Sequence, residues 1–127
     1  MFRWNNEVIM ETALLVFAGL MGAAGVVLAA ASAHGAPGSG LDNAAYMLLF
    51  HAAAMLGGVS LLHQAMLSRS IGQIALCGFV LGGALFAGDV AARAYIGSRL
   101  FPMAAPTGGV ILIASWLALA LAALTAR

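Results

Sequence analysis

Apolar residues fill most of this chain, and the few charged residues divide it into four long segments. The charge-free segments cover residues 12–41, 43–68, 70–88 and 100–126, and each has 19 residues or more. A helix of about 20 apolar residues can cross the ~30 Å hydrocarbon core of a bilayer. The pattern therefore predicts four transmembrane helices. The charged residues that flank or separate them are Arg3, Glu7, Glu11, Asp42, Arg69, Asp89, Arg93, Arg99 and Arg127.

Residues that break helices lie between these segments and set the expected bounds of each span. We expect helices over about 12–33, 44–64, 71–92 and 107–125, with Asp42 or Asn43 capping the second. The short hinge at 65–70 makes the second and third helices antiparallel neighbours, and the 93–106 connection is expected to follow the membrane interface. The sequence thus predicts an all-α fold, with one transmembrane domain over residues 1–127 folded as an up-down-up-down four-helix bundle with short loops.

Composition agrees with a membrane location. Hydrophobic residues make up 64% of the chain and the mean hydropathy is +1.06, whereas soluble domains are roughly 45–50% apolar. Four spans leave no room for a soluble catalytic module. The net charge of +1 and the absence of lysine argue against a nucleic-acid partner and against a polybasic lipid-binding segment. The lone Cys77 lies in an apolar segment, where packing is favoured over redox chemistry.

The first span is expected to stay in the mature protein. Ala31-Ser32-Ala33 resembles a signal-peptide cleavage site. However, the apolar segment before it exceeds the ~7–15 residues of a signal core, and the leader carries acidic residues rather than a basic cluster.

Arginine counts on the two sides of the membrane indicate the orientation of the chain. Three arginines on the side of the termini and two on the other favour both termini in the cytoplasm.

Small residues at helical spacing are expected to pack the bundle, because helices in lipid associate through close backbone approach. The first span carries one continuous small face, and the other spans carry shorter ones. The stripes are Ala18, Gly22, Gly25, Ala29 and Ser32 in the first span; Ala54 and Gly58 in the second; Gly78 and Gly82 in the third; and Ala114, Ala118 and Ala122 in the fourth.

Alternating span directions bring most of the interior polar residues to one leaflet. The candidate polar cluster consists of His34, His51, Asp89, Arg93 and Thr107. Ionisable residues inside a membrane are costly, so each is a candidate for function. Asp89 and Arg93 share a helix face and can pair, either to fix the helix register or to act in function. His51 is either satisfied by a carbonyl or by Asp89, or it serves as a ligand or proton relay.

Metal and haem binding are not favoured. A cation held by His34, His51 and Asp89 has no ligand-spacing motif behind it. Axial haem ligation needs two ligands at matching depth, and His34 and His51 differ by roughly 10 Å in depth at 1.5 Å per residue. We therefore expect neither a metal nor a cofactor.

Four ordered motifs resemble one known family. Ala33-His34-Gly35, Leu49-Phe50-His51-Ala52, Leu85-Phe86-Ala87-Gly88 and Ala105-Pro106-Thr107-Gly108-Gly109, followed by Trp116, are similar to the domain of unknown function 423 family, the transmembrane protein 256-like small membrane proteins. The resemblance implies a four-span bundle, found in bacterial inner membranes and in organellar membranes of eukaryotes. It adds Gly88, Gly108 and Gly109 to the expected packing positions. Relatives often carry Tyr-Gln at Met47 and Leu48, and serine at Asp89.

Two functions follow from these features as alternatives. The first is a non-enzymatic inner-membrane protein that supports or assembles a larger complex, with the lipid bilayer and other membrane subunits or itself as partners. The second is a small transporter or proton-handling protein that uses the His/Asp/Arg cluster. An enzyme acting on lipid would need a nucleophile triad or paired carboxylates, and the sequence shows neither arrangement.

Overall fold

The computed structural model describes residues 5–35 and 37–127, and these fold into four long helices without a strand. The helices are α1 (Asn6–His34), α2 (Leu41–His63), α3 (Arg69–Tyr95) and α4 (Ala104–Leu124). All four are long and apolar enough to cross a membrane. The predicted all-α, four-helix architecture is confirmed.

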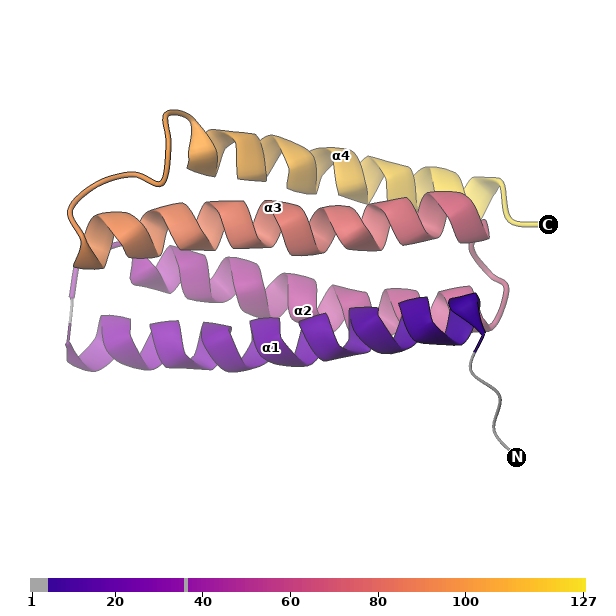
Figure 1. Cartoon of the computed structure of the whole chain (residues 1–127), viewed down its shortest axis with the longest axis horizontal. Coiled ribbons are helices and arrows are strands. Elements are labelled where there is room, and N and C mark those ends of the chain that lie inside the picture. Colours follow the sequence, from indigo (N-terminus) through magenta and orange to yellow (C-terminus); the bar gives the residue numbers. More distant parts are fainter. Residues whose placement is uncertain (1–4, 36) are drawn as a thin grey trace.

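The helices run alternately up and down, so both ends of the described chain lie at one end of the bundle (Figure 1). That end also holds the short connection between α2 and α3. The connection between α1 and α2 and the longer one between α3 and α4 lie at the opposite end.

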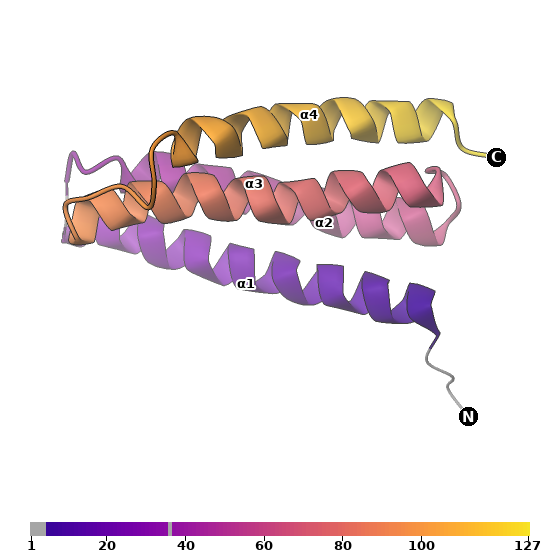
Figure 2. The ribbon, with the colours of Figure 1, turned by 45° about the horizontal axis from the view of Figure 1, so that its top comes forward.

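Neighbours in sequence are also neighbours in space. In the described chain the backbone of α1 lies close to α2, with only a small contact to α3, and the backbone of α4 lies close to α3 alone. A rotated view places α1 and α4 on opposite sides of α2 and α3 (Figure 2). Consequently 22% of the most apolar stretch of each outer helix is buried, compared with 44% for each inner helix. The outer helices therefore present most of their surface to their surroundings.

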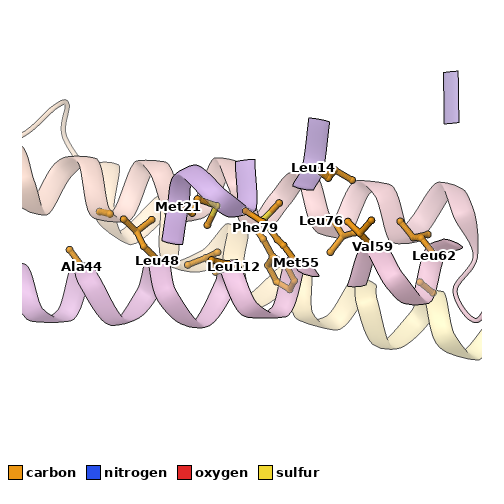
Figure 3. Close-up of a cluster of buried hydrophobic side chains, with 14 of the residues drawn as sticks. Leu14, Met21, Ala44, Leu48, Met55, Val59, Leu62, Leu76, Phe79 and Leu112 are labelled. Carbon is orange, nitrogen blue, oxygen red and sulfur yellow. The ribbon is translucent and has the colours of Figure 1, made fainter. Parts of the chain in front are cut away.

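Large apolar side chains from all four helices meet along the bundle axis (Figure 3). Phe79 of α3 is fully buried near the middle, with Met55 of α2 beside it. Leu14 and Met21 reach this core from α1, and Leu112 reaches it from α4. The core is thus built by the inner helices and covered from each side.

Helices α3 and α4 come closest where both carry glycine. A Cβ built on Gly82 would lie 2.8 Å from the Gly108 carbonyl oxygen, and one on Gly108 would lie 2.7 Å from the Gly82 carbonyl oxygen. One turn away, Ser115 sits directly against Gly78. Backbone contact of this kind is possible only without side chains, as expected for helices that associate in lipid.

The remaining packing glycines divide into close, loose and open positions. A Cβ on Gly25 would lie 2.7 Å from Leu49, and one on Gly58 would lie 2.5 Å from Leu76. Gly88 is also close, since a Cβ there would lie 3.3 Å from Leu100, whereas Gly22 is loose, with Ala52 at 3.9 Å. Gly109 differs from the expectation because nothing lies within 4 Å of its Cβ position. The predicted Ala114, Ala118 and Ala122 stripe holds only in part: Ala122 is fully buried and Ala118 is half-buried, but Ala114 is exposed. Against the middle of α3, α4 instead uses Gly108, Leu112 and Ser115.

All four helices begin earlier than predicted, at Asn6, Leu41, Arg69 and Ala104 instead of about 12, 44, 71 and 107, and local turn chemistry explains two of these starts. Helix α2 begins at Leu41 after Gly40, whose φ of 81° is left-handed, so neither Asp42 nor Asn43 is its cap. Asp42 lies in the first turn instead, where its charge complements the helix dipole. Helix α4 begins at Ala104, which places Pro106 in the first turn, where its missing N–H costs no hydrogen bond.

Candidate functional site

Asp89 is the most deeply buried ionisable side chain described, with 1% of its surface exposed. Its Oδ2 lies 3.3 Å from Nε of Arg93, one turn further along α3. Its Oδ1 accepts a hydrogen bond of 3.0 Å from the backbone N–H of Leu100. The carboxylate therefore joins the end of α3 to the loop that follows, while the Arg93 side chain stays 44% exposed.

His51 occupies a second, separate site between α2 and α4. Its Nδ1 lies 2.6 Å from the carbonyl oxygen of Met47, and Nε1 of Trp116 donates to its Nε2 at 3.1 Å. Because a carbonyl only accepts and an indole N–H only donates, the pattern is satisfied by the neutral imidazole with its proton on Nδ1. Phe79 packs edge-on against His51, with ring centroids 5.2 Å apart. The histidine thus bridges two helices whose backbones do not meet.

The five predicted cluster residues do not form one connected site. Only Asp89 and Arg93 are bonded to each other. His51 is occupied by Met47 and Trp116. His34 ends α1 and is exposed, and Thr107 is exposed in the first turn of α4. Among the residues with described positions, no hydrogen bond or ion pair links His34, His51 or Thr107 to the Asp89–Arg93 pair.

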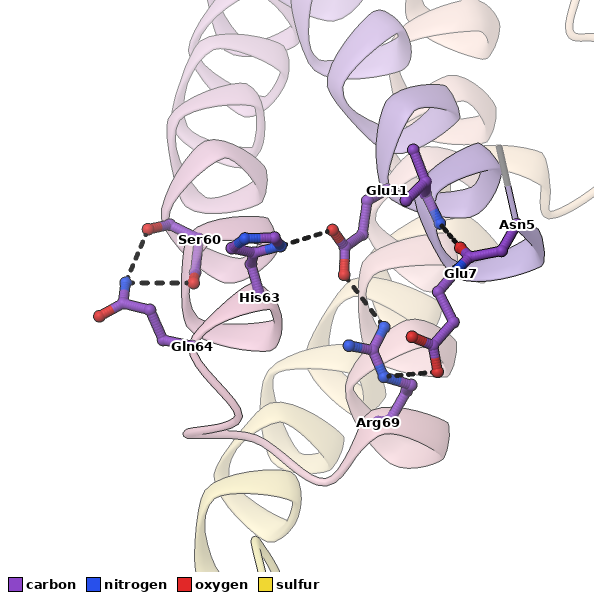
Figure 4. A network of polar contacts seen from close by, with 8 residues as sticks. Asn5, Glu7, Glu11, Ser60, His63, Gln64 and Arg69 are labelled. Carbon is purple, nitrogen blue, oxygen red and sulfur yellow. Dashed lines mark hydrogen bonds and ion pairs between the residues drawn. The ribbon is translucent and has the colours of Figure 1, made fainter. Parts of the chain in front are cut away.

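A polar network that the sequence reasoning missed lies at the other end of the bundle (Figure 4). Glu11 of α1 is at its centre, with its side chain 12% exposed. One carboxylate oxygen lies 3.1 Å from Nδ1 of His63 on α2, and the other accepts from Arg69 on α3 at 3.0 Å. Arg69 also reaches Glu7 at 3.4 Å. We call Glu7, Glu11, His63 and Arg69 the three-helix clasp.

A signal for the clasp was present in the sequence. Glu7 and Glu11 are four residues apart, so they share a helix face. Alternating spans bring the start of the first helix to the boundary that holds His63 and Arg69. Opposite charges at one membrane boundary could therefore have indicated contact between these helices, but this signal was not used.

Replacing Glu11 with alanine is expected to loosen α1 from α2 and α3. The variant loses two hydrogen bonds that the Glu11 carboxylate accepts. Partly exposed hydrogen bonds of this kind stabilise a protein less than buried ones, so we expect the unfolding free energy to fall by about 1–2 kcal/mol. Thermal unfolding in detergent micelles measures the change. Glu7→Ala is the matched control, because Glu7 makes one longer contact through a more exposed side chain. An equal loss in both variants would contradict the central place of Glu11.

A hollow of about 490 Å³ opens between the start of α2 and the end of α3. Arg93 lines it together with Asn43 and Ser39, and Phe86 and Val90 form its apolar wall. Neither Asp89 nor His51 lines this hollow. Across 5–35 and 37–127 no three histidine, cysteine or acidic side chains come together as metal ligands would. The site therefore consists of one positively charged side chain, Arg93, beside an open cavity.

Comparison with known proteins gives one match. Residues 21–109 match the family described as "Protein of unknown function (DUF423)". The match runs from the second half of α1 through α2 and α3 into the start of α4. No curated protein and no solved structure matches the chain. The match covers more than half of the sequence and confirms the resemblance found in its motifs, so the chain belongs to the DUF423 family.

Proposed function

We propose that this protein is a non-enzymatic accessory, assembly or scaffold component of a larger complex in the bacterial inner membrane, with both termini in the cytoplasm. One observation carries the proposal. In the described part of the chain every buried side-chain nitrogen and oxygen has a hydrogen-bond partner within the protein. Because the buried polar groups already bind one another, their role is to hold the helices and a loop in place. The protein therefore acts through its outer surface.

The outer helices supply surfaces suited to other membrane helices. Gly19 of α1 and Gly109 of α4 both face open space, with nothing within 4 Å of their Cβ positions. Large apolar side chains surround them, including Val16 and Leu20 on α1 and Ile113 on α4. Because α1 and α4 lie on opposite sides of the bundle (Figure 2), one copy can contact two neighbours at once. Such a shape supports a scaffold role.

Purification of the tagged protein from its own membrane in mild detergent tests the proposal. We expect other membrane subunits to co-elute with it. Gly19→Leu and Gly109→Leu add side chains at open positions, so each is expected to reduce co-elution severalfold while thermal stability is retained. Gly57→Leu is the matched control, since Gly57 is equally open but lies on the inner helix α2. A chain that always elutes alone would argue strongly against this function.

A small transporter or proton-handling protein is the second candidate. The hollow near the end of the bundle favours this function, because the half-exposed, positively charged side chain of Arg93 lines it. In reconstituted vesicles this function predicts altered ion or proton flux for Asp89→Asn and for His51→Ala with the fold intact. If both variants change only thermal stability, the two sites are structural and the scaffold role gains support.

A further inference from the structure

The loop that joins α3 to α4, residues 96–103, exposes an unusual amount of apolar surface. Ile96 is 76% exposed and Met103 is 58% exposed, with Leu100 at 52% and Phe101 at 44% between them. Tyr95, the last residue of α3, is 63% exposed beside them. Apolar side chains gathered on one short loop indicate a contact surface rather than a solvated turn.

The other two connections do not share this character. Residues 35–40 consist of glycine, alanine, proline and serine. Residues 64–68 expose a single large apolar side chain, Met66. The apolar surface is therefore a property of the α3–α4 loop and not of the bundle's turns in general.

The loop is held against the bundle. The buried Asp89 carboxylate accepts the Leu100 N–H at 3.0 Å. A Cβ on Gly88 would lie 3.3 Å from Cδ1 of Leu100, so the leucine side chain also rests on α3. The two helices that flank the loop are both long enough to span a membrane, and the loop lies at the end of the bundle where they meet (Figure 1). Asp89 thus fixes the loop against the end of α3.

Residues 89–103 carry two arginines and one acidic residue, Asp89, a net charge of +1, and Asp89 is paired with Arg93. Arg93 and Arg99 are both exposed, and no acidic residue follows Asp89 in the sequence. Apolar side chains combined with exposed arginines match the boundary between acyl chains and anionic headgroups. Tyrosine at the end of a span, as at position 95, is typical of the same boundary. This combination favours phospholipid over protein as the occupant.

We propose that the α3–α4 loop inserts Ile96, Leu100, Phe101 and Met103 into the headgroup–acyl boundary of one leaflet, with Arg93 and Arg99 binding the phosphates of anionic phospholipids. Asp89 is a positioning residue in this arrangement. It touches no lipid itself, and it keeps the loop folded onto α3 so that the apolar side chains face the bilayer. The loop is a lipid-binding surface, separate from the helix faces assigned to protein partners.

Spin labels on the full-length chain test the proposal. Single cysteines are placed at Ile96 or Phe101 in a Cys77→Ala background, and Pro37→Cys labels the other connection at the same end of the bundle. The proteins are reconstituted in phosphatidylcholine vesicles with and without phosphatidylglycerol. Power saturation then compares accessibility to oxygen, which concentrates in lipid, with accessibility to a water-soluble nickel chelate.

We expect the oxygen-to-nickel ratio at Ile96 and Phe101 to exceed that at Pro37 by about threefold or more, because interfacial side chains are buried ~5–10 Å into the boundary. Phosphatidylglycerol should raise the ratio further, and Arg99→Gln should reduce that rise. Asp89→Ala should lower the ratio at Phe101 towards the Pro37 value, whereas Asp89→Asn keeps an Oδ1 acceptor and should largely preserve it.

Three results would overturn the proposal. Nickel accessibility at the loop equal to that at Pro37 in every vesicle would place the loop in water. A label shielded from both reagents would show that a second copy of the chain covers the surface. An oxygen-to-nickel ratio unaffected by phosphatidylglycerol would remove the role of the arginines in binding anionic headgroups.

Discussion

Gly108→Ala is expected to destabilise the protein by about 3 kcal/mol, at the upper end of typical overpacking costs. The added methyl would meet the Gly82 carbonyl oxygen and the Phe86 backbone nitrogen, each at 2.7 Å. Both are backbone atoms, so no side-chain rotation can make room and α3 must move away from α4. Because α4 has close backbone contact with α3 alone in the described chain, most of its packing depends on this approach. Thermal unfolding in detergent measures the effect.

Gly109→Ala provides the matched control one residue away. Its Cβ would meet nothing within 4 Å, so the substitution is expected to be neutral or to stabilise by up to about 1 kcal/mol through helix propensity. Equal losses in the Gly108 and Gly109 variants would show that close approach of α3 and α4 does not hold the bundle together. Gly82→Ala should behave like Gly108→Ala, since its Cβ meets the Gly108 carbonyl at 2.8 Å.

His51→Ala is expected to cost about 2–4 kcal/mol, from a cavity beside Phe79 and an indole N–H left without its acceptor. His51 is 6% exposed and uses both ring nitrogens. It also supplies a link between α2 and α4, which lack backbone contact in the described chain. The expected phenotype is reduced thermal stability together with weaker protection of α4 from hydrogen exchange.

Trp116→Phe separates the hydrogen bond from the packing. The phenyl ring can keep part of the contact with Phe79 but cannot donate to His51, so we expect a smaller loss of about 1 kcal/mol, as for other interhelical hydrogen bonds in membranes. A double-mutant cycle with His51→Phe and Trp116→Phe should give a coupling of similar size. Additive losses would mean that the two side chains do not act together.

Charge spacing alone was enough to predict the number of helices and their alternation. Long apolar segments bounded by Asp42, Arg69 and the Asp89–Arg93 pair admit few arrangements in lipid, where backbone groups must be satisfied within helices. Helix ends were less accurate, because local turn chemistry decides them. Gly40 in a left-handed conformation starts α2 before Asp42, and Pro106 sits inside the first turn of α4.

The candidate site was harder to predict because helix rotation is not encoded in spacing. Grouping residues by depth placed His51 near Asp89, yet rotation of α2 turns His51 towards Trp116. Trp116 stands among the sequence motifs, but its position in the chain does not reveal that its indole N–H donates to His51. Similarly, Glu11 was read as part of the leader, although its partners His63 and Arg69 lie 52 and 58 residues away. The depth of a residue along its helix follows from its sequence position, but the side chain that it contacts depends on how the helices are rotated and packed in space.

The order in which the helices pack has a consequence for biogenesis. Each helix makes its main contacts with the helix that precedes or follows it in the sequence. Few of these contacts therefore require a distant part of the chain to be synthesised first. Low sequence separation between contacting residues favours rapid, local assembly. A hairpin of α1 and α2 can form while the ribosome is still making α3, and α4 then docks last onto a preformed partner. The protein is built to enter the bilayer in the order of its synthesis.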